Sequence, residues 1–235
     1  MLRLRIFAGP NGSGKSSLYK QLENNFNLGV YINPDEIHFI ISRSLMLDLS
    51  GFRFVTEQSE WKNFYLNHGL FSKAQILLNS HIENNILVLQ ERPKSYESAI
   101  ISDFLRHQML KTKETFSFET VFSHPSKLNF LQTANIADYK CYLYFAATSS
   151  PEICIERVRQ RTLEGGHNVP IDKIKSRYYL SLQNLLPAMR LAYRVFIFDN
   201  SKTMKLIAEM TPHKNFTLKS NNIPIWVKEY ILDKL

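Results

Sequence analysis

The first strand-like run of the chain leads into a glycine-rich loop, and this loop constrains the fold more than any other feature. Residues 4–8 read L-R-I-F-A, and residues 9–16 read G-P-N-G-S-G-K-S, which completes the pattern G-x-x-x-x-G-K-S. Glycines in such a loop let successive backbone N–H groups converge on phosphate oxygens at a helix N-terminus. Residues 17–22 continue with helical spacing, which is the strand–loop–helix context that the pattern requires. The alternative is a glycine-rich turn that only starts a core helix.

The loop predicts a bound nucleoside triphosphate, with ATP and Mg²⁺ as the expected cofactors. The Lys15 ammonium would place a positive charge on the β- and γ-phosphates, and the Ser16 hydroxyl would bind the metal ion. Arg157, from a later helix, is expected to assist. The loop residues predicted to bind ATP are Gly9, Pro10, Asn11, Gly12, Ser13, Gly14, Lys15, Ser16 and Ser17.

Strand-like runs alternate with amphipathic helical segments along the chain, which predicts a parallel sheet with helices on both faces. The expected fold class is α/β: a P-loop NTPase, kinase-like, with a three-layer α/β/α parallel sheet and a helical insertion. Nucleotides bind such sheets at the carboxyl ends of the strands. The runs span residues 4–8, 30–33, 116–122, 139–147 and 194–199.

The interval 37–115 carries no clear strand and is expected to be mostly helical. It is longer than a crossover needs, so we predict a helical insertion at about 38–113 within a P-loop kinase-like domain of residues 1–205. The insertion is either a cap that binds the phosphate acceptor or a helical layer with no ligand role. Residues 206–235 are expected to form a C-terminal extension with a short strand-like piece and a helix at 224–232.

The bulk composition excludes several classes of protein. With 235 residues and 44% apolar content the chain can bury a full core. It has no apolar run of 18 residues and no leader-like start, so a soluble cytoplasmic protein with no membrane association is expected. The net charge is +8, but basic residues are spread out and interleaved with acids, so nucleic acid is not an expected partner. Cys141 and Cys154 lack the spacing of a metal site or disulfide framework and are expected to be buried packing residues.

A carboxylate follows the second predicted strand. Asn33 can cap a helix, Pro34 fits its first turn, and Glu36 can reach back to the cap. Asp35 is then either a partner of the helix dipole or a general base that accepts a hydroxyl proton and steers the acceptor for in-line attack. The base is the favoured interpretation, because the end of a strand beside the phosphate loop is where the γ-phosphate points.

A second carboxylate lies in F-S-F-E-T, residues 116–120. Glu119 is expected to bind the metal or its water, or a substrate hydroxyl, with Thr120 also placed at the substrate. A buried structural acid is the alternative. Two interpretations also remain open for Asp199, Asn200 and Ser201 after the last predicted strand: they line the base pocket, or they cap the following helix.

A predicted helix that begins near Pro151 carries several arginines before a Gly165-Gly166 break. Arg157 and Arg161 are four residues apart and share a face. We predict a lid at about 157–177 that brings guanidinium groups onto the phosphates, where charge spreads over the transferring group. Arg161 and Arg177 are the arginines expected to act in catalysis. The alternative is a solvated basic helix with ion pairs.

Together these motifs resemble the zeta toxin family of P-loop kinases, and more closely the zeta-toxin-like bacterial proteins labelled predicted ABC-type ATPases. The similarity spans roughly residues 1–205. It rests on residues 6–16, the run I-N-P-D-E-I at 32–37, the run F-E-T at 118–120, the run from 157 to 178 and the D-N-S at 199–201.

The resemblance implies a kinase that phosphorylates a UDP-activated amino sugar, with Asp35 as the catalytic base. It also implies roles for Glu119 as a site acid and for Arg161 in the phosphate lid, and it leaves the second lid residue open between His167 and Arg177. Zeta toxins pair with antitoxins, so an antitoxin protein is an implied partner. A bare ATPase or a nucleotide-dependent protein-binding module is the alternative function, although the Leu-Ser-Gly-Gly-Gln signature of ABC ATPases is missing.

Overall fold

The computed structural model describes residues 1–166 and 168–235, and the chain divides into two compact units. Unit 1 comprises Met1–Leu28 and Ser117–Leu235, and unit 2 comprises Gly29–Phe116. His167, a candidate lid residue, lies outside the described part. Among the described residues, no helix has both the length and the apolar character that crossing a bilayer requires.

Unit 1 is built on a mostly parallel sheet. Its strands are β1 (Arg3–Ala8), β6 (Phe116–Thr120), β7 (Lys140–Ala147), β8 (Arg194–Asp199), β9 (Lys205–Met210) and β10 (Phe216–Leu218). They lie in the order β10-β9-β8-β7-β1-β6. β1 pairs with β7 in parallel, with Leu4 opposite Cys141, and β7 pairs with β8 in parallel. β9 and β10 add an antiparallel edge.

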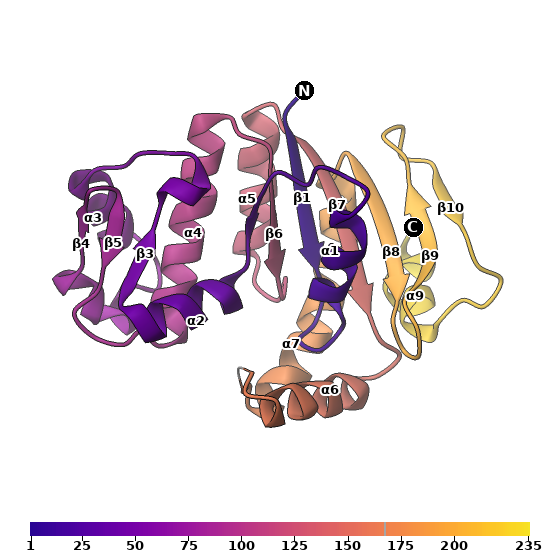
Figure 1. Cartoon of the computed structure of the whole chain (residues 1–235). Helices are drawn as coiled ribbons and strands as arrows, with labels where there is room; N and C mark the ends of the chain where they lie inside the picture. Colours follow the sequence, from indigo (N-terminus) through magenta and orange to yellow (C-terminus); the bar gives the residue numbers. More distant parts are fainter. Residues whose placement is uncertain (167) are drawn as a thin grey trace. The chain divides into compact units, whose positions relative to one another are not determined.

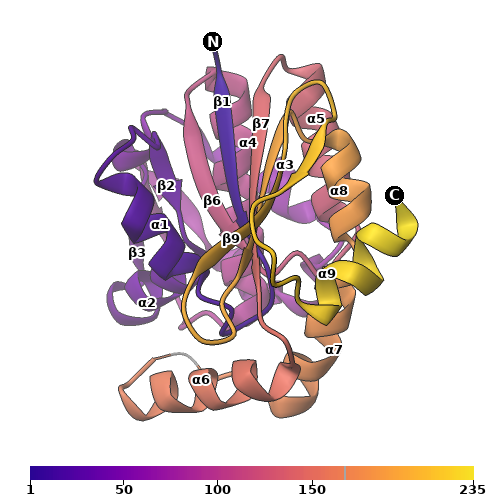
Figure 2. The same cartoon turned by 90° about the vertical axis from the view of Figure 1, so that its right-hand side faces the viewer.

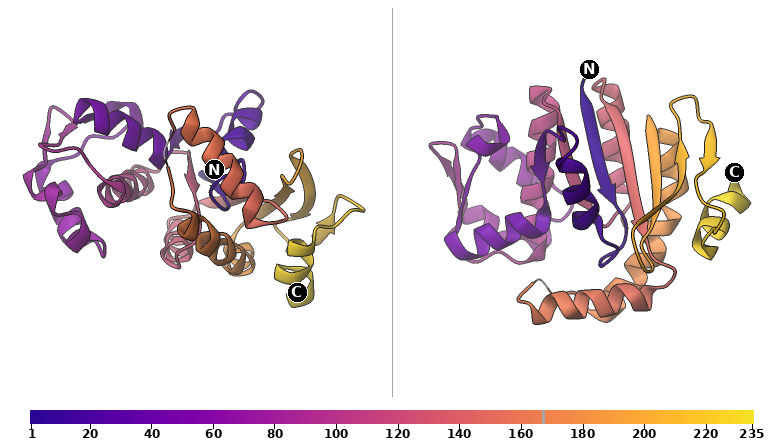
Figure 3. Two further views of the ribbon diagram at one scale, coloured as in Figure 1. Left: turned by 90° about the horizontal axis from the view of Figure 1, so that it is seen from below. Right: turned by 45° about the vertical axis from the view of Figure 1, so that its right-hand side comes forward.

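Helices cover both faces of this sheet. α1 (Lys15–Glu23) lies on one face, while α5 (Ser126–Ile136), α8 (Leu185–Leu191) and α9 (Ile225–Tyr230) lie on the other (Figures 1 and 2). α6 (Pro151–Leu163) crosses the carboxyl ends of β1 and β7, and α7 (Ile171–Gln183) packs against it (Figure 3). Strand residues Leu4, Ile6, Leu143 and Ile197 are fully buried. The predicted α/β fold with a parallel sheet and two helical layers is confirmed.

Unit 2 combines helices with a small antiparallel sheet. β2 (Val30–Ile32) leads into α2 (Pro34–Ser44), followed by α3 (Gln58–Leu66) and α4 (Ser95–Thr112). β3 (Met46–Asp48), β5 (Ile86–Val88) and β4 (His81–Glu83) form the sheet, in that order. The expectation that interval 37–115 has no strand is therefore wrong. Each strand has only three residues, which is too short for a period-two pattern to be recognised.

Aromatic rings fill the core of unit 2. Phe104 of α4 makes edge contacts with Trp61 and Phe64 of α3 at centroid distances of 5.1 and 5.3 Å. Tyr65 meets Trp61 at 5.2 Å. Trp61 and Phe104 are at most 1% exposed, and the Trp61 indole N–H donates to Ser80 Oγ at 2.7 Å. Burial of a large ring is among the strongest stabilising contributions in a small core.

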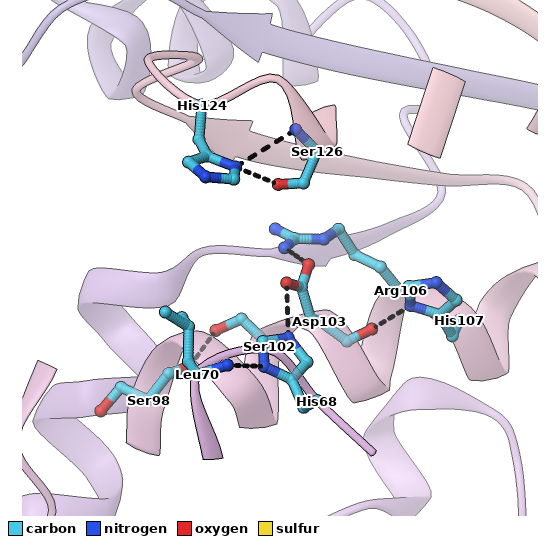
Figure 4. A network of polar contacts seen from close by, with 9 residues as sticks. All are labelled: His68, Leu70, Ser98, Ser102, Asp103, Arg106, His107, His124 and Ser126. Atoms are coloured by element: carbon cyan, nitrogen blue, oxygen red, sulfur yellow. Dashed lines mark hydrogen bonds and ion pairs between the residues drawn. The ribbon is translucent and has the colours of Figure 1, made fainter. Parts of the chain in front are cut away.

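A polar network lies beside these rings in unit 2 (Figure 4). His68 Nδ1 accepts from the Leu70 N–H at 3.1 Å, so Nε2 carries the proton and donates to Asp103 at 3.2 Å. Asp103 also binds the Arg106 guanidinium. Burial lowers the pKa of Arg106 to about 9, which leaves it charged at neutral pH. The network therefore pairs a buried cation with a carboxylate, which meets the requirement for burying charge.

Candidate active site

The phosphate loop occupies the turn between β1 and α1, as the sequence predicts. Gly9, Gly12 and Gly14 have φ of 140°, 75° and 95°, a region that side chains disfavour. A Cβ at Gly9 would collide with the Ala146 carbonyl oxygen of β7, and one at Gly12 would come within 2.5 Å of the Cys154 carbonyl of α6. These glycines are therefore required both by backbone conformation and by the close approach of two neighbouring elements.

Lys15 and Ser16 begin α1, where unpaired N–H groups and the helix dipole favour an anion. The Lys15 ammonium donates to the Pro10 carbonyl at 2.9 Å, which folds its side chain back over the loop. Ser16 Oγ donates to Glu119 Oε2 at 3.1 Å. The structure thus brings together two residues that are 103 positions apart and that the sequence assigned to one metal site.

The Ser16–Glu119 pair suits a magnesium ion by its chemistry. Both groups present oxygen donors, and Mg²⁺ in kinases is held by one or two carboxylates together with substrate phosphates. Within residues 1–166 and 168–235, no three His, Cys, Asp or Glu side chains gather as a metal cluster. A hydroxyl and a carboxylate in direct contact beside the phosphate loop supply the protein ligands that this mode of binding needs, so the residues fit the ion.

Glu119 and Thr120 sit at the carboxyl end of β6, and both side chains are buried. Thr120 Oγ1 accepts the Phe122 N–H at 3.2 Å, so its hydroxyl shapes the turn that leaves the strand. The prediction that Thr120 contacts substrate stays a prediction.

Arg157 and Arg161 project from α6, which begins at Pro151 after Ser150 as predicted. Arg157 Nη1 donates to the Gly12 carbonyl at 3.5 Å, so this guanidinium already faces the phosphate loop. Arg161 and Arg177 are partly buried. The lid function of the segment 157–177 stays a prediction.

The Gly165-Gly166 pair ends α6 with a specific hydrogen-bond pattern. Gly165 has φ 87°, its N–H donates to Thr162 O at 3.1 Å, and the Gly166 N–H donates to Arg161 O at 2.9 Å. These two bonds are the Schellman motif, which requires a left-handed residue at the helix end. The glycine pair therefore has a structural role as a helix cap, whether or not it also acts as a hinge.

A buried thiol and a buried phenol both contact Thr148, the residue that follows β7. Burial raises the pKa of Cys154, whose thiol lies 3.2 Å from Thr148 Oγ1, and this keeps it protonated. Burial also raises the pKa of Tyr178, whose hydroxyl donates to the Thr148 carbonyl at 2.6 Å. Cys141 and Cys154 are both free and buried, which confirms their predicted packing role.

Asp35 lies in unit 2, at the start of α2. Asn33 caps this helix, since its side chain accepts the Asp35 N–H at 3.0 Å, and its amide donates to Glu36 at 3.3 Å. The predicted helix start and its capping pair are confirmed. Asp35 itself is exposed. Its role as base stays a prediction.

Asn200 is a site residue whose contact the sequence did not reveal. Its side-chain amide donates to the Ser13 carbonyl in the phosphate loop at 3.0 Å. The partners are 187 residues apart, and the only signal for the contact was the D-N-S run at the end of a strand.

Comparison with one solved structure supports the fold. A chain from the PezAT chromosomal toxin–antitoxin system of Streptococcus pneumoniae superposes with a TM-score of 0.50 at 12% identity, over 98% of this chain and 79% of that one. The 235-residue protein therefore has the P-loop kinase-like fold. A candidate kinase from Chloroflexus aurantiacus gives a TM-score of 0.43 at 14% identity, over 75% of this chain and 79% of that one. No family model and no curated protein sequence matches. The fold agrees with the resemblance to the zeta toxin family that the motifs indicate.

Proposed function

We propose that this protein is an ATP-dependent phosphotransferase of the zeta toxin type, which moves the γ-phosphate of ATP to a hydroxyl of a small acceptor. The observation that carries the proposal is the 3.1 Å contact between Ser16 and Glu119 beside a complete phosphate loop. A carboxylate paired with the loop serine is the arrangement that a metal-dependent kinase needs. A UDP-amino sugar is the acceptor class that the resemblance implies.

Each residue of the proposed site has a defined task. The loop N–H groups and Lys15 would hold the phosphates, and arginines 157, 161 and 177 would neutralise charge as it develops. Ser16 and Glu119 would hold Mg²⁺, whose positive charge draws electron density from the phosphate oxygens. The arrangement serves positioning and electrostatic stabilisation, which account for most of the catalysis in phosphoryl transfer.

Asp35 is the proposed general base. The acceptor oxygen attacks the γ-phosphorus, the bond from that phosphorus to the β–γ bridging oxygen breaks, and ADP leaves. The hydroxyl proton passes to the Asp35 carboxylate. Solvent exposure of Asp35 supports the proposal because an acceptor can reach it, and the Asn33 cap fixes its backbone.

The direct test is label transfer from γ-labelled ATP to a panel of sugar nucleotides, nucleosides and small alcohols. We expect Mg²⁺-dependent labelling of one acceptor class. Lys15→Ala should lower transfer by about 10²–10³-fold, because it removes a charge that stabilises the transition state. Lys20→Ala removes an exposed lysine from the same helix and should change little. Phosphate release without transfer to any acceptor would favour the bare ATPase, and nucleotide binding without turnover would favour the binding module.

An antitoxin partner is part of the proposal, since the similar structure comes from a toxin–antitoxin system. Expression of the wild-type chain alone in a bacterial host should arrest growth, and expression of Asp35→Asn should not. Equal growth with both chains would contradict a toxic role and leave the kinase activity to be judged by the transfer assay.

A further inference from the structure

The turn at residues 199–201 in unit 1 is organised by one carboxylate. Asp199 Oδ2 accepts the Ser201 N–H at 3.1 Å, and Oδ1 accepts the Ser201 hydroxyl at 2.9 Å. Oδ1 also accepts the indole N–H of Trp226 from α9 at 3.0 Å. A carboxylate with several donors fixes the turn and ties it to the C-terminal helix.

The same turn is bonded to the end of β7. The Asn200 N–H donates to Ala147 O at 2.8 Å, and the Ser149 N–H donates to Ser201 Oγ at 2.8 Å. Three segments that are distant in sequence therefore meet at residues 199–201: the end of β7, the end of β8 and helix α9. Within this arrangement Asn200 has little freedom to move independently.

Asn200 is bonded to one peptide of the phosphate loop. Its amide donates to the Ser13 carbonyl, and that carbonyl shares a planar peptide with the Gly14 N–H. In a trans peptide the C=O and N–H point in opposite directions, so holding the carbonyl from one side aims the N–H at the other. Ser13 is fully buried, and a Cβ at Gly14 would collide with Asn200 Nδ2, so the contact is tight.

Trp226 connects α9 to the turn at residues 199–201 and to β7. It is 3% exposed, and its ring lies 6.2 Å from Phe145 of β7. Ile225, the preceding residue, is 70% exposed, so it is a suitable control position on the same helix. Trp226 therefore makes two kinds of contact: its ring packs near Phe145, and its indole N–H donates to the Asp199 carboxylate.

We propose that Trp226 and Asn200 are positioning residues for the phosphate loop: the Trp226–Asp199 bond holds the turn from which Asn200 orients the Ser13–Gly14 peptide. The C-terminal helix thereby sets the affinity of the loop for nucleotide phosphates. This inference rests on the nucleotide site of the proposed function, and it adds a structural control that the phosphate-loop motif does not contain.

ATP affinity of single and double variants tests the coupling. Asn200→Ala should weaken binding about tenfold, since about 1.4 kcal/mol corresponds to that factor and one hydrogen bond contributes about this much. Trp226→Phe keeps an aromatic ring but removes the donor, and it should weaken binding about threefold to fivefold. In the double variant the losses should not multiply, because Trp226 acts through Asn200. Ile225→Ala should bind like the wild type.

The indole N–H signals supply a readout that a merely structural role would not give. The chain has two tryptophans, so an ¹⁵N-labelled sample shows two indole signals, and Trp226→Phe identifies one of them. ATP should shift the Trp226 signal and leave that of Trp61 in place. Asn200→Ala should reduce this shift. Thermal melting of each variant tests whether it is folded, and Asp199→Ala, which removes the acceptor of the indole N–H, replaces Trp226→Phe if the latter is not folded.

The outcomes separate the inference from the proposed function. If the wild type binds ATP and Trp226→Phe binds it equally well, or if the two losses multiply, the positioning role is wrong and the kinase proposal stands. If ATP leaves the Trp226 signal unmoved, the role is also wrong. If the wild type binds no nucleotide, both proposals fall.

Discussion

The two compact units use partly buried and buried polar side chains in different ways. In unit 1 several of them donate to backbone carbonyls of loops, as in Lys15 to Pro10, Asn200 to Ser13 and Tyr178 to Thr148. In unit 2 several of them join one side chain to another, as in His68, from the loop after α3, to Asp103 of α4, and His38 of α2 to Ser98 of α4 at 2.8 Å. The first kind fixes the shape of loops that meet a ligand, and the second fixes how helices pack.

This difference predicts different consequences of substitution. Changes at the loop-directed groups of unit 1 should alter nucleotide handling with little loss of stability. Changes inside unit 2 should lower stability and leave the intrinsic nucleotide affinity of unit 1 unchanged in the folded molecule.

The largest expected effect is on the core of unit 2. Phe104→Ala removes a ring that is 1% exposed and contacts Trp61 and Phe64, so it should lower the free energy of unfolding by about 3–5 kcal/mol. Urea unfolding followed by circular dichroism measures this, with Leu78→Ala, which is 54% exposed, as the control. A loss under about 1 kcal/mol would mean that the ring cluster does not carry the stability of unit 2.

Glu119→Gln is expected to affect phosphoryl transfer more than stability. It keeps the shape of the side chain and its acceptor oxygen toward Ser16, but it removes the negative charge proposed to hold Mg²⁺. Transfer should fall about 10²-fold and need more Mg²⁺ to saturate, while ATP affinity without metal should change little. Titration of activity against Mg²⁺ is the measurement. An unchanged metal requirement would show that Glu119 is a structural acid.

The smallest expected effect is at the helix cap. Gly165→Ala meets no atom within 4 Å, but it must keep φ at 87°, so it should cost about 1–2 kcal/mol of stability. Gly51→Ala, at a position with open space and no positive φ, should be neutral or slightly stabilising. Urea denaturation of both variants tests the Schellman cap. Equal stability of the two would indicate that the segment after α6 adapts freely.

The sequence predicts local features of this molecule well and distant contacts poorly. The phosphate loop, the Asn33 cap and the Ser150-Pro151 helix start were predictable because each depends on residues a few positions apart. The three-residue strands of unit 2 and the antiparallel β9 were missed because their patterns are short and their partners lie elsewhere in the chain. The pairing of Ser16 with Glu119 agreed with a prediction only because the loop motif assigned Ser16 to the metal and the position of Glu119 at a strand end assigned that carboxylate to the same ion. The D-N-S run at 199–201 was recognised, but it did not indicate the contact of Asn200 with Ser13.

The most direct test of the kinase proposal compares Asp35→Asn with Glu36→Gln, two isosteric changes at neighbouring exposed acids of α2. Transfer of label from γ-labelled ATP to the acceptor is measured together with ATP affinity. The account predicts that Asp35→Asn lowers transfer by about 10²-fold or more with ATP affinity unchanged, and that Glu36→Gln retains transfer, because only Asp35 accepts the acceptor proton. Transfer by Asp35→Asn within about threefold of the wild type would contradict the account.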